Sequence, residues 1–540
     1  MAKILQICVV LLLLQIKCMS AIEIDIDDPD SIRRAASEIA HGLMSYYKGN
    51  ETGFTPGLLP YPPYYWWQSG ALMGTMVNYY RISGDPTYNS IVSEGLLYQT
   101  GPDDDYMPQE QRSSLGNDDQ AFWGMAALAA AESNFPDPPQ GSPSWLSLAQ
   151  AVFNEQIGRW DTTLCGGGLR WQIYQILGYN LKNTISNGAL FNIASRLARY
   201  TGDSLYSDWA IKIWDWLEAV GLIDEDYNVY DNAEAQNLNC TELDHNQWTY
   251  NAGVMLLGAA TLYNHTGSEL WMNRTWGLLN RSAEIYFPDG VMKDICEEHT
   301  ACNIDQQSFK AYLSRWMAVT TQMAPFTYDI IIPLLRSSAV AAAAQCIGTA
   351  PKTDVPPGQV CGQKWYLNGT WDGSDGAGQQ MSALEVVLGT LIQKTRAPVT
   401  TSTGGTSISN PTAGHNTSDT PPLLSYEPVN RADRIGAWFL TGFIVVATLW
   451  STYFMVSRSF EFEGLSKLNA VAVMQRREKR RPVLEKGKGK QKVSANVETL
   501  GTLPEMDEEK QPNMIARPRP ISVHAGTIKQ SNPHHSRNSI

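Results

Sequence analysis

Two adjacent aspartates, Asp118 and Asp119, stand at the head of a long apolar segment that begins at Asn117. Cleavage of a glycosidic bond with retention needs two carboxyl groups roughly 5–5.5 Å apart, one as nucleophile and one as acid/base. The like charges of neighbouring carboxylates raise the pKa of one group, which then stays protonated as a general acid requires. Helix capping is the alternative, because Asn and Asp are preferred at helix N-termini. For the bare Asn-Asp-Asp sequence, capping is the favoured interpretation.

Other polar and aromatic residues gather at the starts of further helix-like segments. The candidate sugar-binding residues are Trp67, Gln68, Asn117, Lys182, Asn183, Asn187, Gln247, Tyr250, Asn251, Asp305, Gln306 and Lys310. If these starts converge, they form a cleft of rings, carboxylates and amides, which suits sugars because rings stack on their apolar faces and polar groups bond their hydroxyls. A core position is the alternative for the aromatic members, and for Trp67 and Tyr250 the two interpretations are about even.

The elements that must position these residues are helix-period apolar segments, separated by short polar or Gly-Asp turns. Six such segments start near Trp66, Asn117, Ser186, Asn246, Gln306 and Gln379. They recur at intervals of about 50–70 residues, and another amphipathic segment lies between most of them. This pattern predicts an all-α fold, an (α/α)6 toroid with small residues on its inner helices. An irregular helical solenoid is the alternative.

The two ends of the chain predict secretion and one membrane span. Residues 1–21 have a charged start, an apolar run and a small-residue exit, which is typical of a signal peptide. Residues 435–457 form an uncharged apolar run that is long enough to cross a bilayer. The segment 458–540 is rich in Lys and Arg, so the positive-inside rule places it in the cytosol as a basic and disordered tail. We expect a type I single-pass protein of the plasma membrane.

Composition narrows the possible classes further. The chain has 540 residues with a formal net charge of -13, which argues against nucleic acid as a partner. Its 17 Trp, 24 Tyr and 13 Phe supply the apolar surface that disordered chains lack. Residues 397–434 are rich in Thr, Ser, Gly and Pro, and we expect an O-glycosylated stalk there. One folded catalytic domain, residues 22–396, remains outside the cell.

Sequons and cysteines agree with an extracellular domain. Asn-x-Ser/Thr sequons precede the predicted span at Asn50, Asn239, Asn264, Asn273, Asn280, Asn368 and Asn416. Outside the signal peptide the cysteines are Cys165, Cys240, Cys296, Cys302, Cys346 and Cys361. Six cysteines in an oxidising compartment predict three disulfides among fifteen connectivities. Our local choices are Cys296–Cys302 and Cys346–Cys361, which leave Cys165–Cys240. A zinc site is the alternative, but no His has ligand spacing, so no metal is expected.

Several spaced segments carry a resemblance to a known family. The stretch from Gly101 to Glu132, which contains the aspartate pair, resembles the signature region of glycoside hydrolase family 76. The segments YYWWQSGALMGTMVNYYRISGDPTY, DHNQWTYNAGVML and CNIDQQSFKAYLSRW are similar to that family as well. Within it, the match is closest to the fungal Dfg5/Dcw1 group of cell-wall proteins and covers essentially all of 22–396.

This resemblance implies an (α/α)6 fold and a retaining activity on α-1,6-mannosidic linkages, without a cofactor. It assigns Asp118 as nucleophile and Asp119 as acid/base, and so reverses the preference for capping. For the fungal group it implies a transglycosidase that moves glycoproteins from the mannose-containing glycan of their GPI anchor onto β-glucan of the wall. Many members of the group are GPI-anchored, whereas this chain has a predicted span. A non-catalytic glycan-binding wall protein is the alternative function.

Overall fold

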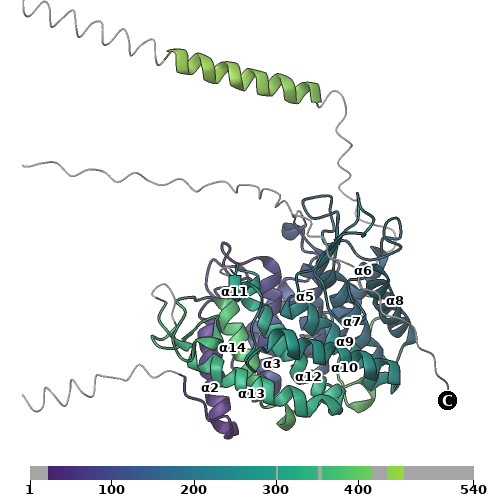
Figure 1. Ribbon diagram of the computed structural model, residues 1–540, viewed down its shortest axis with the longest axis vertical. Helices are drawn as coiled ribbons and strands as arrows, with labels where there is room; N and C mark the ends of the chain where they lie inside the picture. Colours follow the sequence, from purple (N-terminus) through teal and green to yellow (C-terminus); the bar gives the residue numbers. More distant parts are fainter. Residues whose placement is uncertain (1–21, 113, 300–301, 351–354, 415–433, 455–540) are drawn as a thin grey trace, which may run out of the picture. The chain divides into compact units, whose positions relative to one another are not determined.

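The computed structural model describes residues 22–112, 114–299, 302–350, 355–414 and 434–454. The predicted signal peptide, the sequon Asn416, the last residues of the predicted span and the tail 458–540 lie outside the described residues. The chain divides into two compact units, one up to Asp433 and one from Arg434 onward (Figure 1).

The described part of the first unit is mostly helical. Its α-helices are α2 (Pro29–Met44), α3 (Trp66–Ser83), α4 (Asn89–Tyr98), α5 (Asn117–Glu132), α6 (Trp145–Gly158), α7 (Thr184–Thr201), α8 (Ser204–Val220), α9 (Thr249–Thr266), α10 (Glu269–Tyr286), α11 (Cys296–His299), α12 (Phe309–Met323), α13 (Tyr328–Ala344) and α14 (Ala377–Gly389). The 3-10 turns η2 (Gln306–Ser308), η3 (Pro325–Thr327) and η4 (Trp365–Leu367) precede or follow them. The six predicted inner segments correspond to α3, α5, α7, α9, α12 and α14.

The six inner helices pack against one another in chain order, and α14 also packs against α3, so the series closes on itself. A second helix covers each of them: α4 packs on α3, α6 on α5, α8 on α7, α10 on α9, α13 on α12 and α14, and α2 on α14. Because an outer helix lies between successive inner helices and returns along them, the inner helices run in the same direction. Their N-terminal ends therefore lie at one end of the domain.

Small residues let the inner helices approach closely. A Cβ on Gly258 of α9 would lie 2.3 Å from the ring of Phe191 on α7, and one on Gly253 would lie 2.8 Å from the ring of Trp316 on α12. Aromatic residues supply much of the core, in which Trp123, Trp214 and Trp365 are fully buried. The prediction of small-residue inner helices is thus confirmed by contacts between neighbours.

Short strands join the loops at the helix starts. The strands β1 (Leu181–Asn183), β2 (Asn232–Glu234) and β3 (Leu243–Asp244) form one antiparallel sheet, in which Asn183 pairs with Asn232. The strands β4 (Cys346–Gly348) and β5 (Val360–Cys361) form a second antiparallel pair. The fold is mostly helical, as expected, and these ladders are additions that are too short for a two-residue period to show in the sequence.

The predicted disulfides are confirmed as Cys165–Cys240, Cys296–Cys302 and Cys346–Cys361. The six predicted glycosylation sites that the structure describes, Asn50, Asn239, Asn264, Asn273, Asn280 and Asn368, are all exposed.

Residues 397–414 belong to the folded domain, and the expectation that a stalk begins at residue 397 is corrected. The Val399 N–H donates to the Glu132 carbonyl at 2.8 Å, and the Leu146 N–H donates to Ser407 Oγ at 2.9 Å. Asn154 Nδ2 donates to the carbonyls of Pro411 and Ala413 at 3.0 and 2.9 Å. Composition alone misleads here, because a Ser/Thr-rich segment can satisfy its backbone on polar groups of neighbouring helices.

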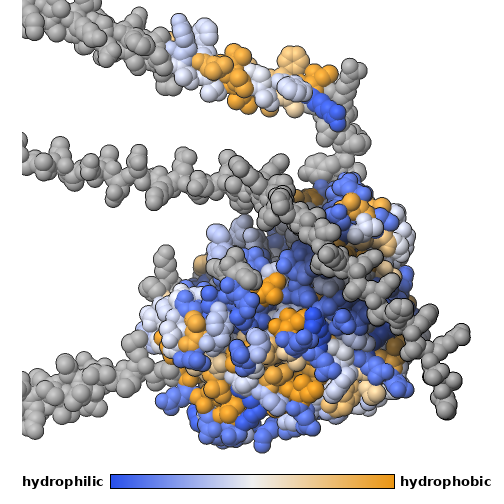
Figure 2. Space-filling model, in the orientation of Figure 1, coloured by the Kyte–Doolittle hydropathy of each residue, from blue (hydrophilic) through white to orange (hydrophobic). Residues whose placement is uncertain are grey.

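Two described helices are long and apolar enough to cross a membrane. The helical stretch Pro325–Ala344 includes α13, which packs on α12 and α14, so it is an outer helix of the domain. The helix Arg434–Phe454 has none of its apolar window buried and covers most of the predicted span (Figure 2).

Candidate active site

The aspartate pair occupies the first turn of α5. The Gly116 N–H donates to Asp119 Oδ2 at 2.7 Å, and the Asp119 N–H donates to Asp118 Oδ1 at 3.0 Å. Asn117 points to neighbouring loops instead, since its Nδ2 donates to the Arg170 carbonyl at 2.8 Å and its Oδ1 accepts from Arg159 Nε at 2.8 Å. Capping and chemistry are therefore compatible: Asp119 caps the helix with one oxygen while both carboxylates border a cavity.

Gly116 shows how close the two carboxylates are. A Cβ on Gly116 would lie 2.3 Å from Asp118 Oδ1 and 3.1 Å from Asp119 Oδ2. The separation of these two oxygens cannot exceed the sum of those distances. This separation is too short for the roughly 6.5–9.5 Å of an inverting pair and is compatible with the roughly 5–5.5 Å of a retaining pair.

Asp118 is also tied to the neighbouring helix. Its Oδ2 accepts from Asn183 Nδ2 at 3.3 Å, and Asn183 in turn caps α7 by accepting from the Ser186 N–H at 3.3 Å. The pairing of β1 with β2 sets Asn232 opposite Asn183 and brings Asp231 to the same edge of the cavity.

The aspartate pair opens into a cavity of about 250 Å³. Its lining residues are Trp67, Asp118, Asp119, Phe122, Trp171, Leu181, Asn183, Ile185, Asp231, Asn232, Trp248, Tyr250, Asn303, Asp305, Gln306 and Phe309. Four are carboxylates, and no Lys or Arg is among the described residues that line it. Such a cleft favours neutral or cationic ligands over anionic ones.

A second cavity, of about 680 Å³, adjoins the first. The two share Trp67, Asp119, Trp171 and Asp305 as lining residues. The second cavity is also lined by Tyr61, Tyr64, Tyr65 and Trp66, which come from the segment before α3 and from its start. Asp119 and Asp305 therefore stand where the two cavities meet.

Burial makes these carboxyls weak acids. It raises the pKa of Asp118 well above its ordinary value, and the charge of Asp119 raises it further. Burial raises the pKa of Asp119 to about 6, with a contribution from the charge of Asp305 and against the stabilising hydrogen bond from Gly116. Burial also raises the pKa values of Asp231 and Asp305. The Asp118–Asp119 pair can therefore keep one proton in mildly acidic solution, as an acid and a nucleophile require together.

The structure brings some of the predicted sugar-binding residues to the cleft. Trp67, Asn183, Tyr250, Asp305 and Gln306 line the smaller cavity.

The other candidates lie outside the described lining of both cavities: Gln68, Asn117, Lys182, Asn187, Gln247, Asn251 and Lys310. Most are buried and bond protein groups. Lys182 Nζ donates to the carbonyls of Asp161, Leu164 and Gly167 at 2.8, 2.8 and 2.5 Å. Asn187 bonds the backbone of Leu169, and Asn251 Nδ2 donates to Asp231 Oδ1 at 3.0 Å.

Sequence reasoning missed Trp171, Asp231, Asn232 and Asn303, which the cavity lining includes. The first three lie in loops and a short strand, away from the helix starts on which the prediction depended. Asn303 is two residues from Asp305, so its place close to a helix start is the signal in the sequence that indicates it. Trp248 and Phe309 face the cavity as well.

Known proteins resemble this chain over most of its length. Residues 31–402 match glycosyl hydrolase family 76. The chain is 46% identical over 442 residues to mannan endo-1,6-alpha-mannosidase DCW1 of Saccharomyces cerevisiae, covering 80% of this chain and 96% of the relative. A putative mannan endo-1,6-alpha-mannosidase of Schizosaccharomyces pombe is 45% identical over 433 residues, with coverages of 79% and 95%.

Solved structures agree with this result. Dfg5 from Chaetomium thermophilum, in complex with glucosamine, is 46% identical and superposes with a TM-score of 0.69 over 72% of this chain and 97% of that one. An α-1,6-mannanase of Salegentibacter sp. shares the fold at 18% identity, with a TM-score of 0.53 over 67% of this chain and 99% of that one. The latter structure is an inactive variant with two consecutive aspartates replaced by asparagine, in complex with α-1,6-mannotriose.

Proposed function

The chain belongs to glycosyl hydrolase family 76, and we propose that it is a retaining glycosidase or transglycosidase that acts on α-1,6-mannosidic linkages of cell-surface glycans. It is an enzyme of the mannan endo-1,6-alpha-mannosidase type, to judge from relatives whose length it covers almost completely. The observation that carries the proposed mechanism is the buried pair Asp118 and Asp119, which border the smaller cavity together.

In the proposed reaction, a carboxylate oxygen of Asp118 attacks the anomeric carbon of an α-mannoside while Asp119 donates its proton to the leaving glycosidic oxygen. The product is a mannosyl ester of Asp118. Asp119, now ionised, takes the proton of an incoming hydroxyl, which attacks the same carbon and releases Asp118. Water as the incoming group gives hydrolysis, and a sugar hydroxyl gives transfer.

Other parts of the proposal depend on the surroundings of the pair. The closed series of helix pairs supports an (α/α)6 toroid with the cleft at the N-terminal ends of its inner helices. The residues proposed to contact the sugars are Trp67, Asn183, Tyr250, Asp305 and Gln306. The buried candidates are proposed to hold these residues and their loops in position. An acidic cleft also suits an amino sugar, such as the glucosamine bound by the Chaetomium thermophilum relative.

We further propose that the domain is extracellular and that one span, residues 435–457, holds it at the plasma membrane. The three disulfides, the exposed sequons and the apolar helix Arg434–Phe454 support this location. The proposed partners are α-mannoside glycans, including the GPI-anchor glycan of wall proteins, and a β-glucan acceptor. The proposed role is the attachment of such glycoproteins to the cell wall.

Product analysis tests the transfer step. Full-length protein is incubated with a mannose-containing anchor glycan, with and without a β-glucan oligosaccharide, and the products are separated and sequenced by mass spectrometry. We expect a mannosyl–glucan conjugate that forms only when both sugars are present. Free mannosides as the sole products would refute the transfer step and leave a hydrolase.

The rate is expected to fall at high pH, where the Asp118–Asp119 pair loses the one proton that the acid must donate. Burial raises the pKa of both carboxyls, that of Asp119 to about 6, so the pair keeps this proton to a higher pH than an ordinary carboxyl would. Asparagine at position 305 removes a negative charge that raises the pKa of Asp119, so the descending limb of kcat/KM should move to lower pH in Asp305→Asn. Asp208→Asn, on the exposed surface of α8, is the control and should leave the limb in place.

A further inference from the structure

The segment 302–308 carries Asn303, Asp305 and Gln306 to the cleft, and polar contacts fix its course. Asn303 Oδ1 accepts from the N–H groups of Asp305 and Gln306, each at 3.0 Å. On the side of α3, Trp67 Nε1 donates to Asp305 Oδ1 at 3.0 Å, and Gln68 Nε2 donates to the Ile304 carbonyl at 2.9 Å. Gln68 thus holds the backbone next to Asp305, although it does not line either cavity itself.

On the other side, Lys310 follows the segment in the first turn of α12. Its side chain is completely buried, with Nζ 2.9 Å from Glu297 Oε1 and donating to the Gln363 carbonyl at 2.6 Å. The same ammonium group lies 3.8 Å from the centre of the Trp365 ring. These contacts surround the ammonium group with protein, so it cannot reach a sugar in the cleft.

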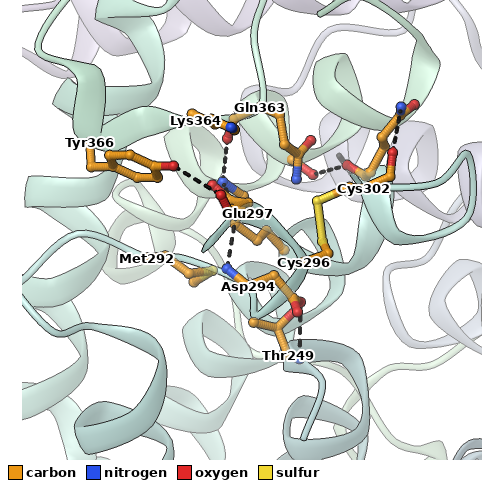
Figure 3. A network of polar contacts seen from close by, with 12 residues as sticks. Thr249, Met292, Asp294, Cys296, Glu297, Cys302, Gln363, Lys364 and Tyr366 are labelled. Carbon is orange, nitrogen blue, oxygen red and sulfur yellow. Dashed lines mark hydrogen bonds and ion pairs between the residues drawn. A yellow bond between two sulfur atoms is a disulfide. The ribbon is translucent and has the colours of Figure 1, made fainter. Parts of the chain in front are cut away.

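Glu297 connects this lysine to α9, the helix that carries Tyr250. The Asp294 N–H donates to Glu297 Oε1 at 2.9 Å, and Asp294 Oδ2 accepts from the N–H and the hydroxyl of Thr249 at the start of α9 (Figure 3). The Tyr366 hydroxyl donates to the Glu297 carbonyl at 3.1 Å. Glu297 therefore contacts α12 through its carboxylate and the chain between α13 and α14 through its backbone carbonyl, and it reaches α9 through Asp294.

The disulfide Cys296–Cys302 connects the ion pair to the cleft segment through the chain. Cys296 precedes Glu297 in the chain, and Cys302 is the first residue of the cleft segment, so the disulfide joins the start of this segment to the chain beside the buried ion pair (Figure 3). The segment is thus held at both ends: by the disulfide before Asn303 and by the Lys310–Glu297 pair after Ser308.

We propose that the Lys310–Glu297 ion pair and the Cys296–Cys302 disulfide position Asp305 beside Asp119, so that Lys310 is a positioning residue of the cleft. The inference rests on the proposed function, in which Asp305 contacts the sugar in the cleft. Stability alone gives a weak reason for the pair, because replacing a buried ion pair by apolar residues is often neutral or stabilising. Glu297 Oε2 is moreover buried without a hydrogen-bond partner among the described residues.

The test replaces the pair by apolar residues in the full-length protein, as Lys310→Met with Glu297→Leu. The matched control is Arg196→Met with Glu132→Leu, which removes another buried pair, 2.7 Å apart, at the C-terminal ends of α7 and α5. Hydrogen exchange is followed by mass spectrometry without substrate. We expect the amides of residues 305–308 to exchange about tenfold faster or more in the first variant, because they lose the anchor of their segment, and to be unchanged in the control.

Activity gives a second measurement. With α-1,6-mannotetraose as substrate, kcat/KM should fall by about 10- to 100-fold in the first variant and stay within about twofold of the unaltered protein in the control. The descending pH limb should move in the same direction as in Asp305→Asn, a change that a loss of stability alone would not produce.

Several outcomes decide the inference. The inference would be overturned if the amides of residues 305–308 exchanged at an unchanged rate in the first variant, or if their exchange became equally faster in the control. If the first variant does not fold, the same measurement is made on Cys296→Ser with Cys302→Ser. Faster exchange of the amides of residues 305–308 then supports the inference, and unchanged exchange overturns it. Because exchange is measured without substrate, an unaltered protein that turns over no mannoside would refute the proposed function and leave this inference standing.

Discussion

Asp118→Asn is expected to lower kcat on α-1,6-mannotetraose by on the order of 10⁴-fold or more, because the amide cannot form the mannosyl ester. Asp119→Asn is expected to lose roughly 10²–10⁴-fold, as for removal of a general acid. Both side chains keep their shape as asparagine, so neither change should alter the fold. The two variants should regain activity with different added reagents, and this difference distinguishes the nucleophile from the acid/base.

An activated mannobiosyl fluoride needs no acid, so Asp119→Asn should turn it over to the ester and then stall. Azide should release that ester as the α-mannosyl azide with retained configuration. In Asp118→Asn, azide can only take the place of the missing nucleophile and should give the β-mannosyl azide. Nuclear magnetic resonance distinguishes the two products.

Covalent trapping completes this test. A fluorinated mannoside with a good leaving group should label the unaltered protein on the peptide that contains Asp118, as mass spectrometry would show. No adduct at Asp118, with glycan binding retained in Asp118→Ala, would favour a non-catalytic glycan-binding protein. An adduct on Asp119 would exchange the two proposed roles.

Gly116→Ala is expected to lower kcat/KM by about 10²-fold, although it removes no functional group. The Gly116 backbone has φ −90°, which alanine adopts freely, so the substitution introduces no backbone strain. Its Cβ, however, would lie 2.3 Å from Asp118 Oδ1, and the carboxylate must move away. A displacement of about 1 Å in a catalytic group can cost 10²-fold in rate.

Gly158→Ala is the matched control, because a Cβ on this last residue of α6 meets no atom of the described residues around it within 4 Å. It should leave kcat/KM unchanged. Thermal unfolding of Gly116→Ala should show a loss of about 1 kcal/mol or less, typical of a changed N-cap. Full activity in Gly116→Ala would show that the carboxylates tolerate displacement, contrary to the proposed geometry.

The course of the six inner helices was accessible from sequence, because apolar periodicity and Gly-Asp turns are local signals. The start of α5 at Asn117 agrees with its prediction, and α7, α9, α12 and α14 start within three residues of theirs. Residues 397–414 were not accessible in this way. Their hydrogen bonds to α5 and α6 depend on partners more than 200 positions away in the chain.

By itself, the sequence determined that two adjacent carboxylates head a buried helix and that polar residues head the other inner helices. For the disulfides it only favoured two pairs that are close in the chain and left fifteen connectivities open, and the structure confirmed the favoured set. Only the tertiary structure decided which polar residues enter the cleft. Gln68 and Lys310 stand at helix starts just as Trp67 and Asp305 do, yet loops from elsewhere in the chain engage their polar groups. The physical reason is that a buried polar group bonds whichever partner the fold brings to it, and helical period carries no information about that partner.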